Sequence, residues 1–338
     1  MIRSPAPVVL LFVLCACVSV TTVAATTVAG KTTVGKIAIG KINAAKTVSG
    51  SCPPRRGVAV QVLGSGGPIA DDARASSAYL VWLDGASRVL IDAGGGAFLR
   101  FGEAGASFAD LDFVGISHLH TDHSADFPAL LKSGNFSNRV RPLTVAGPDE
   151  RLPFPGFEDY LASLLAEGGA YAYLGGYLDG SAGLVELSSV EVAGDETHPT
   201  RVFGDRDSRL RVDAIHVPHG IVPALAFRIE VDGVRIVFAS DQNGSDPRFV
   251  EFAKAADLLV MHLVIPEGTT GIASRLHAPP SVIGEIARNA GARRLLLSHL
   301  MARSLARLDE SLEIVGGRYP GPVLVADDLF CINDITER

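Results

Sequence analysis

The chain has 338 residues, 47% of them hydrophobic and 20% charged, which is enough for one large domain with a full core or for two small ones. The 36 glycines and 7% aromatic residues suit an α/β protein with many turns better than a helical bundle. Residues 1–56 hold seven of the 30 basic residues and none of the 37 acidic ones, so residues 57–338 carry a net charge of −14. Such an acidic body disfavours a nucleic-acid partner unless a local basic patch overrides the mean charge.

The N-terminus has the pattern of an export signal. Arg3 precedes the apolar run Pro7–Val20, which is too short for a relaxed membrane span and has the length of a signal-peptide core. Two processing sites compete: cleavage after Val23–Ala25 would make residues 1–25 the signal, whereas the lipobox-like Leu14–Cys17 would place a lipid on Cys17. An uncleaved anchor is the alternative. We expect an exported protein that is periplasmic, secreted or anchored by lipid to a bacterial envelope.

A low-complexity stretch follows the signal. Residues 21–51 repeat Thr, Val, Ala, Gly and Lys in units of about five residues, with too few large side chains to offset the entropy of ordering. We interpret residues 26–56 as a disordered tether and residues 57–338 as the folded body. Only Cys52 and Cys331 remain beyond the signal, one at each end of this body. They could pair in an oxidising compartment or stay free thiols, because sequence does not determine their proximity.

The body alternates predicted strands and helices. In its first half we predict four strands before a helix: Val58–Leu63, the hairpin of Ala78–Leu83 with Arg88–Ile91, and Phe113–Ile116, followed by the helix Ala125–Lys132. In its second half we predict strands at Leu210–His216, Ala224–Val231, Val234–Ala239, Leu258–Met261 and Arg294–Leu297, with helices at Pro247–Ala255 and Pro280–Asn289. Two such runs indicate two packed sheets with helices outside.

The segment from Asp149 to Ser208 is less regular. It carries six aromatic residues among glycines and prolines: Phe154, Phe157, Tyr160, Tyr171, Tyr173 and Tyr177. An aromatic lid over a functional site is one interpretation. We favour ordinary packing, because most aromatic side chains simply fill space in a core.

Four metal-capable side chains lie within six residues. His118, His120, Asp122 and His123 follow the predicted strand Phe113–Ile116 directly, at a strand-to-helix turn. Alternation along an extended segment points His118 and His120 toward one ion, and the turn brings Asp122 and His123 toward a second. A nitrogen-rich site beside a mixed carboxylate–imidazole site suits zinc better than magnesium or calcium. We therefore expect two Zn²⁺ ions, or other divalent transition metals in their place.

The run from His118 to His123 resembles the HxHxDH signature of the metallo-β-lactamase superfamily, and that family's other motifs follow in order. The resemblance implies an α/β, four-layer αββα sandwich of two mixed sheets flanked by helices. It implies that Asp92 braces the metal loop. By position it also implies the full ligand set: His118, His120 and His219 for the first zinc, Asp122, His123 and His299 for the second, and Asp241 bridging both.

Within that superfamily the chain is similar to the branch holding ribonuclease Z, arylsulfatases and cyclic-nucleotide phosphodiesterases. The runs Ala224–Glu230 and Ala256–His262 carry this similarity. Leu263 stands where ribonuclease Z has a glutamate, which puts a glutamate–histidine proton relay in doubt. Only 22 positions separate His219 from Asp241, which leaves no room for the long tRNA-gripping arm of bacterial ribonuclease Z. Together with the export signal and the acidic body, this makes tRNA processing an unexpected activity.

Four of the nine histidines stand outside the expected ligand set, and we interpret three of them: His198, His216 and His277. We interpret His216 as a buried structural residue or a hydrogen-bond partner of the ligands, and His198 as a surface loop residue. The family position of His277 overhangs the metal pair, where it could protonate a leaving group or bind the anionic oxygens of a substrate. We expect His277 and Asp122 to be the catalytic residues.

The expected reaction is ester hydrolysis. A hydroxide bridging the two zinc ions would attack a small phosphodiester or sulfate ester. The expected partner is therefore a small-molecule ester, with no nucleic acid, and no segment specifies an oligomer. Two alternatives stay open: attack on a carbonyl, as in lactonases or β-lactamases, and a non-catalytic, metal-binding surface lipoprotein.

Overall fold

The computed structural model describes residues 52, 56–194, 198–333 and 335. They belong to one compact unit, Lys41–Arg338. Residues 1–51 hold the expected signal, Cys17 and most of the expected tether, and they lie outside the described residues. No helix in the described part of the chain is both long and apolar enough to cross a membrane.

Two mixed sheets form the centre of the fold, each with seven strands within the described residues. The first sheet contains, in spatial order, β14 (Cys331–Ile332), β1 (Val58–Gly64), β2 (Ala78–Leu83), β3 (Ala86–Ile91), β4 (Phe113–Gly115), β5 (Leu143–Pro148) and β6 (Leu187–Val192). The second contains β13 (Val323–Val325), β12 (Leu295–Ser298), β11 (Leu258–His262), β10 (Val234–Phe238), β9 (Val222–Val231), β8 (Leu210–His219) and β7 (Thr200–Phe203).

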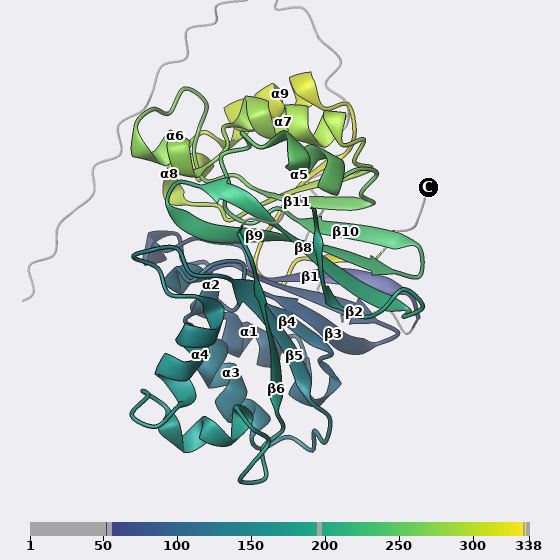
Figure 1. Ribbon diagram of the computed structural model, residues 1–338. Helices are drawn as coiled ribbons and strands as arrows, with labels where there is room; N and C mark the ends of the chain where they lie inside the picture. The colour runs from purple at the N-terminus through teal and green to yellow at the C-terminus, as the bar shows by residue number, and fades with distance from the viewer. Residues whose placement is uncertain (1–51, 53–55, 195–197, 334, 336–338) are drawn as a thin grey trace, which may run out of the picture. The chain divides into compact units, whose positions relative to one another are not determined.

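Helices cover the outer face of each sheet (Figure 1). The α-helices are α1 (Ala97–Glu103), α2 (Thr121–Ser124), α3 (Phe127–Gly134), α4 (Phe157–Leu165), α5 (Pro247–Phe252), α6 (Ile272–Leu276), α7 (Pro280–Asn289), α8 (Ala302–Leu305) and α9 (Leu308–Arg318). Three short 3₁₀ helices are η1 (Ala70–Asp72), η2 (Phe108–Asp110) and η3 (Ala172–Tyr177). Helices α1, α3 and α4 lie outside the first sheet, and α5, α7 and α9 outside the second (Figure 1). The expected four-layer αββα sandwich is confirmed.

Strand alternation explains why several strands are buried along their whole length. In β2, Tyr79 and Val81 face the core between the sheets, whereas Leu80 and Trp82 face the core under the helices of the first sheet. Both faces of the strand are covered, so both sets of side chains are apolar. The same layering in the second sheet sends Ile236 of β10 inward and Val237 outward.

The ends of the body are joined covalently. Cys52 and Cys331 form a disulfide, with their Cα atoms 6.0 Å apart at a sequence separation of 279. Cys331 lies in β14, the edge strand that pairs with β1. Of the two interpretations left open by the sequence, pairing is the one observed.

The aromatic segment mostly packs, as expected. Phe157 of α4 and Tyr177 of η3 are buried in the core under the first sheet, and the hydroxyl of Tyr177 donates to the carbonyl of Leu131 over 2.7 Å. Tyr173 is exposed on the surface. Phe154 approaches the histidine cluster, with its ring centroid 6.2 Å from that of His120.

Candidate metal centre

The strand ends deliver the candidate residues to one edge of the sandwich. Strands β3 and β4 run parallel, so Asp92 after β3 and His118 after β4 emerge on the same side. In the second sheet β10, β11 and β12 run parallel, which places Asp241 and His299 side by side. Strand β8 runs antiparallel to β9, which is antiparallel to β10, so His219 at the end of β8 joins them. The strand β8 extends three residues beyond the expected His216, and this extension carries His219 into the site.

One group of potential ligands consists of three histidines and a carboxylate. The candidate ligand atoms of His118, His120, His219 and Asp241 all lie within 4.8 Å of one another. His118 Nε2 is 3.0 Å from His120 Nδ1 and 4.0 Å from Asp241 Oδ2. His219 Nε2 is 3.6 Å from the same carboxylate oxygen. The four side chains thus converge on a common point.

A second group lies next to the first. His123 Nε2 and His299 Nε2 are 3.6 Å and 3.2 Å from Asp122 Oδ2. Asp241 Oδ2 is 3.8 Å from His123 Nε2, and Asp241 Oδ1 is 3.5 Å from His299 Nε2. Because Asp241 contacts histidines of both groups, it occupies the position of a shared ligand. The structure therefore brings together all seven residues that the sequence singled out.

Unsatisfied nitrogens test whether the cluster fits a metal. The Nε2 atoms of His123 and His219 are buried, and within the described residues neither has a hydrogen-bond partner. A buried polar atom without a partner costs free energy in either protonation state, and native proteins rarely tolerate it without an ion or water. Both atoms point at Asp241 Oδ2. The donor set fits a metal, and the cluster can bind one.

Hydrogen bonds behind the cluster hold two of the imidazoles in the tautomer that a metal needs. His123 Nδ1 donates to Asp92 Oδ2 over 2.8 Å, and His219 Nδ1 donates to the carbonyl of Leu276 over 3.0 Å. With Nδ1 donating, the Nε2 lone pair is free to face the cluster. Asp92 itself accepts from the amide and hydroxyl of Ser117 over 2.7 Å and 2.9 Å, which holds the carboxylate in place.

The metal loop also lies close to the loop after β3. A Cβ added to Gly94 would overlap the carbonyl oxygen of Asp122, so only glycine allows this approach. The amide of Ala93 donates to the carbonyl of His123 over 2.8 Å, which links the two loops. These contacts position Asp122 and His123 together.

Burial and the charges of neighbouring side chains set the protonation states of the cluster residues. Burial and the imidazole of His123 hold the pKa of His118 well below its usual value. Burial alone would raise the pKa of Asp241, but the neighbouring His299 and His262 outweigh it and keep that pKa well below its usual range. Burial would also lower the pKa of His123, but Asp92 outweighs it and raises that pKa to about 9. Neutral imidazole and ionised carboxylate are the metal-binding forms, so binding at His123 displaces a proton.

The three other histidines that the sequence analysis interpreted lie in different environments. His277, after α6, is buried, with Nδ1 3.7 Å from Asp241 Oδ2 and without a hydrogen-bond partner in the described structure. His216 lies outside the cluster, and its Nε2 donates to the carbonyl of Val192 over 2.9 Å, as a structural residue would. His198 is exposed. His198 is on the surface as the sequence predicted, and His277 lies beside the cluster as the resemblance implied, whereas His216 is half-buried rather than buried.

Sequence reasoning assigned no role to His262. It ends β11, is buried, and its Nδ1 lies 2.7 Å from Asp241 Oδ1. A signal was available in the sequence, because β11 is predicted between two strands whose ends carry Asp241 and His299. A polar residue at the end of the intervening strand should emerge at the same edge.

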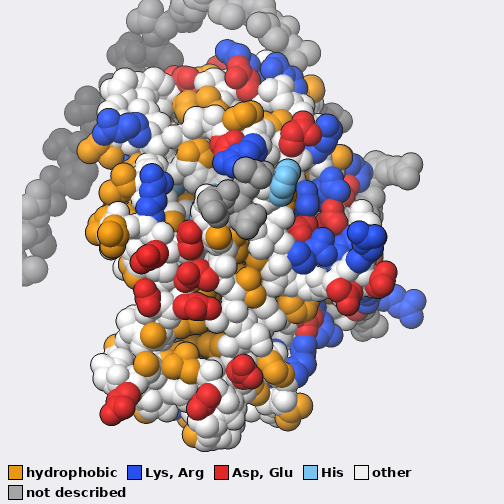
Figure 2. Space-filling view, viewed as in Figure 1, with side chains coloured by type: hydrophobic (Ala, Val, Ile, Leu, Met, Phe, Trp, Pro, Cys, Tyr) orange, Lys and Arg blue, Asp and Glu red, His pale blue; other side chains and the backbone are white. Residues whose placement is uncertain are grey.

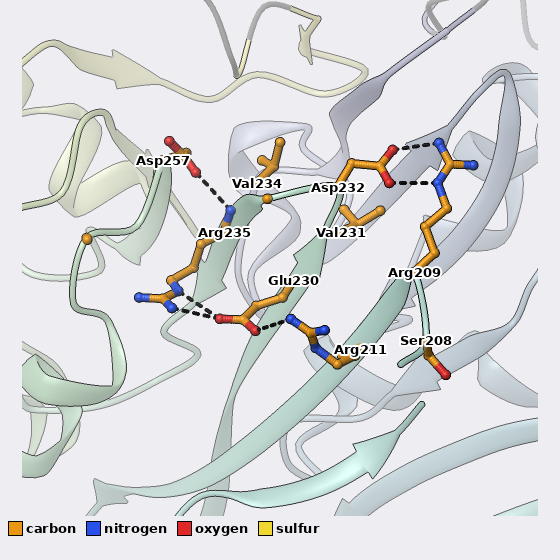
Figure 3. Close-up of a pocket in the computed structure, with 11 residues that line it drawn as sticks. Ser208, Arg209, Arg211, Glu230, Val231, Asp232, Val234, Arg235 and Asp257 are labelled. Atoms are coloured by element: carbon orange, nitrogen blue, oxygen red, sulfur yellow. Dashed lines mark hydrogen bonds and ion pairs between the residues drawn. The ribbon is translucent and has the colours of Figure 1, made fainter. Parts of the chain in front are cut away.

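A surface hollow lies away from the metal cluster. Its volume is about 660 Å³, and its lining comes from the start of β8 and the β9–β10 turn (Figure 3). Because β8 is ten residues long, this end lies roughly 30 Å along the strand from His219. Arg211 and Arg235 both bind Glu230, and Arg209 binds Asp232 (Figure 3). These arginines are paired with the carboxylates beside them, so we interpret the hollow as the end of a hairpin that is stabilised by ion pairs.

Comparisons with known proteins agree with this geometry. The family model described as "Beta-lactamase superfamily domain" matches residues 87–300. Ribonuclease Z from Haloferax volcanii is 29% identical over 307 residues, covering 79% of this chain and 92% of that protein. Ribonuclease Z from Mycobacterium bovis is 28% identical over 284 residues, covering 80% and 96%. The crystal structure of the short form of human tRNase Z has a similar fold, with a TM-score of 0.63 at 20% identity over 81% of this chain and 98% of that one.

These relatives overturn two expectations. The expected function, hydrolysis of a small phosphodiester or sulfate ester, and the expected absence of a nucleic-acid partner are both wrong, because the relatives are named for ribonuclease activity. The absence of a long arm was poor evidence. The 284 aligned positions cover 96% of the Mycobacterium protein and 80% of this chain. The Mycobacterium ribonuclease Z therefore carries only short insertions relative to this chain.

The net charge of the body was a poor guide to nucleic-acid binding for a physical reason. A mean charge of the whole body says little about the field at one site, because screening in physiological salt limits the interaction between exposed charges to a distance of about 8 Å. Acidic and basic side chains are grouped rather than evenly mixed on the face drawn in Figure 2. The matched motifs, the fold and the metal-capable cluster agree, and the chain belongs to the metallo-β-lactamase superfamily of metal-dependent hydrolases.

Proposed function

We propose that this chain is a metal-dependent ribonuclease that hydrolyses phosphodiester bonds of RNA. The observation that carries the proposal is its similarity to proteins named ribonuclease Z over 92–96% of their length, together with a complete cluster of metal-capable residues at the expected edge.

The metal centre of this proposal contains two zinc ions. His118, His120 and His219 would hold one ion, Asp122, His123 and His299 would hold the other, and Asp241 would be shared. The orphaned Nε2 atoms of His123 and His219 support this assignment. When bound, such a pair of ions lowers the pKa of a water molecule and stabilises charge on phosphoryl oxygens.

The protein side chains have separate tasks in this proposal. Asp92 keeps His123 in the correct tautomer, and the ionised Asp122 and Asp241 supply negative charge for the cations. His277 Nδ1 is the proton-handling atom, because it is buried, lacks a partner in the described structure and faces the cluster. It can hydrogen-bond an oxygen of the scissile phosphate or of the leaving group. Leu263 is buried and cannot supply a carboxylate, so His277 acts without a glutamate partner.

The test compares RNA cleavage by two variants in which a histidine of strand β8 is replaced. With zinc supplied, the wild-type chain should cleave a precursor tRNA faster than an unstructured RNA of equal length. His219→Ala should abolish this cleavage, whereas His216→Ala, which removes a histidine outside the cluster, should retain it. A wild-type protein that is folded and loaded with zinc but cleaves neither RNA would refute the proposed function.

The location of the protein is a separate proposal. We infer that the chain works in an oxidising compartment outside the cytoplasm. The disulfide Cys52–Cys331 supports this inference, since such bonds persist mainly in oxidising compartments, and so does the signal-like pattern of residues 1–25. Fractionation of cells expressing the full chain, with alkylation of free thiols before lysis, tests it. Recovery of the chain in the cytoplasm with both thiols alkylated would contradict it.

A further inference from the structure

A buried polar chain crosses the core beneath the metal cluster. Tyr79 lies in β2 of the first sheet, and its ring is packed against Phe238 in the core between the sheets. Its hydroxyl reaches the second sheet, 3.0 Å from His262 Nε2 and 2.9 Å from Ser298 Oγ. His262 Nδ1 in turn lies 2.7 Å from Asp241 Oδ1. A single buried tyrosine is thereby connected to the carboxylate shared by both ligand groups.

The directions of these hydrogen bonds follow from which atoms can donate. A carboxylate oxygen accepts, so His262 Nδ1 donates to Asp241 Oδ1. The other ring nitrogen then accepts from Tyr79, whose hydroxyl stays protonated because burial raises its pKa. Since Tyr79 has one hydrogen, the hydroxyl of Ser298 donates to the Tyr79 oxygen. Each hydrogen in the chain therefore has one acceptor.

His262 is not a ligand of a third metal. Its ring nitrogens, together with Asp241 and His299, form a third group of potential ligands. However, Asp241 and His299 already belong to the groups described above, and both nitrogens of His262 are used in hydrogen bonds. His262 therefore connects Asp241 to Tyr79.

This arrangement divides the two oxygens of Asp241 between two tasks. Oδ1 accepts from His262, whereas Oδ2 faces the unpaired Nε2 atoms of His123 and His219 at 3.8 Å and 3.6 Å. Rotation of the carboxylate would exchange these positions. A hydrogen bond to Oδ1 from a ring that is itself held at Nε2 opposes that rotation.

We propose that Tyr79 is a positioning residue that, through His262, orients the Asp241 carboxylate toward the metal cluster. The inference rests on the metal centre of the proposed function, but it does not depend on RNA being the substrate. Tyrosine is needed rather than phenylalanine because the ring alone would fill the same space in the core without holding His262. Loss of such an outer hydrogen-bond partner typically weakens metal binding or activity about ten- to a hundredfold.

The test compares two tyrosine-to-phenylalanine variants of the full chain. Tyr79→Phe removes the hydroxyl beneath the cluster. Tyr177→Phe removes an equally buried hydroxyl that donates to the carbonyl of Leu131 in the helical layer of the first sheet. Zinc affinity is measured by competition with a chromogenic chelator, and ligand geometry by the absorption spectrum of the cobalt(II)-substituted protein. Thermal unfolding shows that each variant is folded.

We expect Tyr79→Phe to bind zinc about ten- to a hundredfold more weakly and to change the cobalt spectrum, while Tyr177→Phe matches the wild type in both. In the RNA assay, Tyr79→Phe should lower kcat more than it changes KM, because it alters the centre rather than the RNA contacts. Wild-type affinity, spectrum and kcat in Tyr79→Phe would overturn the inference.

Two further outcomes keep the two proposals distinguishable. If the wild type binds zinc but cleaves no RNA, the proposed function fails and the zinc comparison still decides the role of Tyr79. If Tyr79→Phe does not fold, His262→Leu removes the connecting ring at similar volume. Wild-type zinc affinity in His262→Leu would then overturn the inference, and an affinity lowered at least tenfold would support it.

Discussion

Asp92→Asn isolates the hydrogen bond that holds a metal-facing histidine. The aspartate accepts three hydrogen bonds, from His123 Nδ1 over 2.8 Å and from the amide and hydroxyl of Ser117 over 2.7 Å and 2.9 Å. An asparagine has nearly the same shape, but its NH₂ group cannot accept. One of the three donors must then face another donor, or His123 must change to the tautomer with its proton on Nε2.

The magnitude follows from the bonds that are lost. A buried hydrogen bond to a charged group contributes about 1.5–3 kcal/mol, so Asp92→Asn should lower the free energy of unfolding of the metal-free protein by that amount. If His123 changes tautomer, its Nε2 no longer offers a lone pair to the second ligand group. The affinity of that group for zinc should then fall about ten- to a hundredfold, equivalent to about 1.4–2.7 kcal/mol.

A matched control is available in the turn between β13 and β14. Asp328 accepts from the amide and hydroxyl of Ser65 over 3.1 Å and 2.8 Å, the same donor pair that Ser117 offers to Asp92. Asp328→Asn should therefore lower stability without changing zinc affinity. Both variants are measured by urea unfolding after metal removal and by chelator competition for zinc. The reasoning fails if Asp92→Asn binds two zinc ions as tightly as the wild type, or if Asp328→Asn weakens zinc binding equally.

Three other predictions follow from the same structure. Removing metal with a chelator should abolish RNA cleavage and lower the melting temperature, because ions that bind only the folded state stabilise it, and added zinc should restore both. Gly94→Ala should lower the free energy of unfolding by about 1–3 kcal/mol in urea, since its Cβ would overlap the Asp122 carbonyl; unchanged unfolding would contradict this. Reducing the Cys52–Cys331 bond should cost about 2–5 kcal/mol, visible as a lower urea midpoint in dithiothreitol, and Cys52→Ser with Cys331→Ser should show no such response.

The sequence alone was sufficient to identify the metal cluster. His118, His120, Asp122 and His123 are contiguous, and strand alternation followed by a tight turn determines where such neighbours point. The distant members, His219, Asp241 and His299, were placed by their positions in the motifs of the resembling family, and the structure shows that the strand ends bring them to one edge of the sandwich. The four-layer fold followed from the same strands and from the family resemblance.

Other features depended on contacts between residues that are far apart in sequence. Tyr79 reaches His262 and Ser298 across the two sheets, at separations of 183 and 219 residues. Nothing in the local pattern around Tyr79 distinguishes it from any other inward-facing aromatic residue of a buried strand. The pairing of Cys52 with Cys331 likewise required the edge strand β14 to be placed beside β1.

Amino-acid composition was the least reliable basis for predicting the partner of this protein. The net charge of −14 led to the wrong expectation about nucleic acids, because a sum over the chain contains no information on where charges lie. The sequence by itself thus determined which residues carry the metal chemistry, through local periodicity for His118–His123 and through the family resemblance for the distant members. Apart from Asp92, which the resemblance already assigned to the metal loop, only the tertiary structure decided which side chains hold those residues in place, because such contacts depend on how two sheets pack against each other.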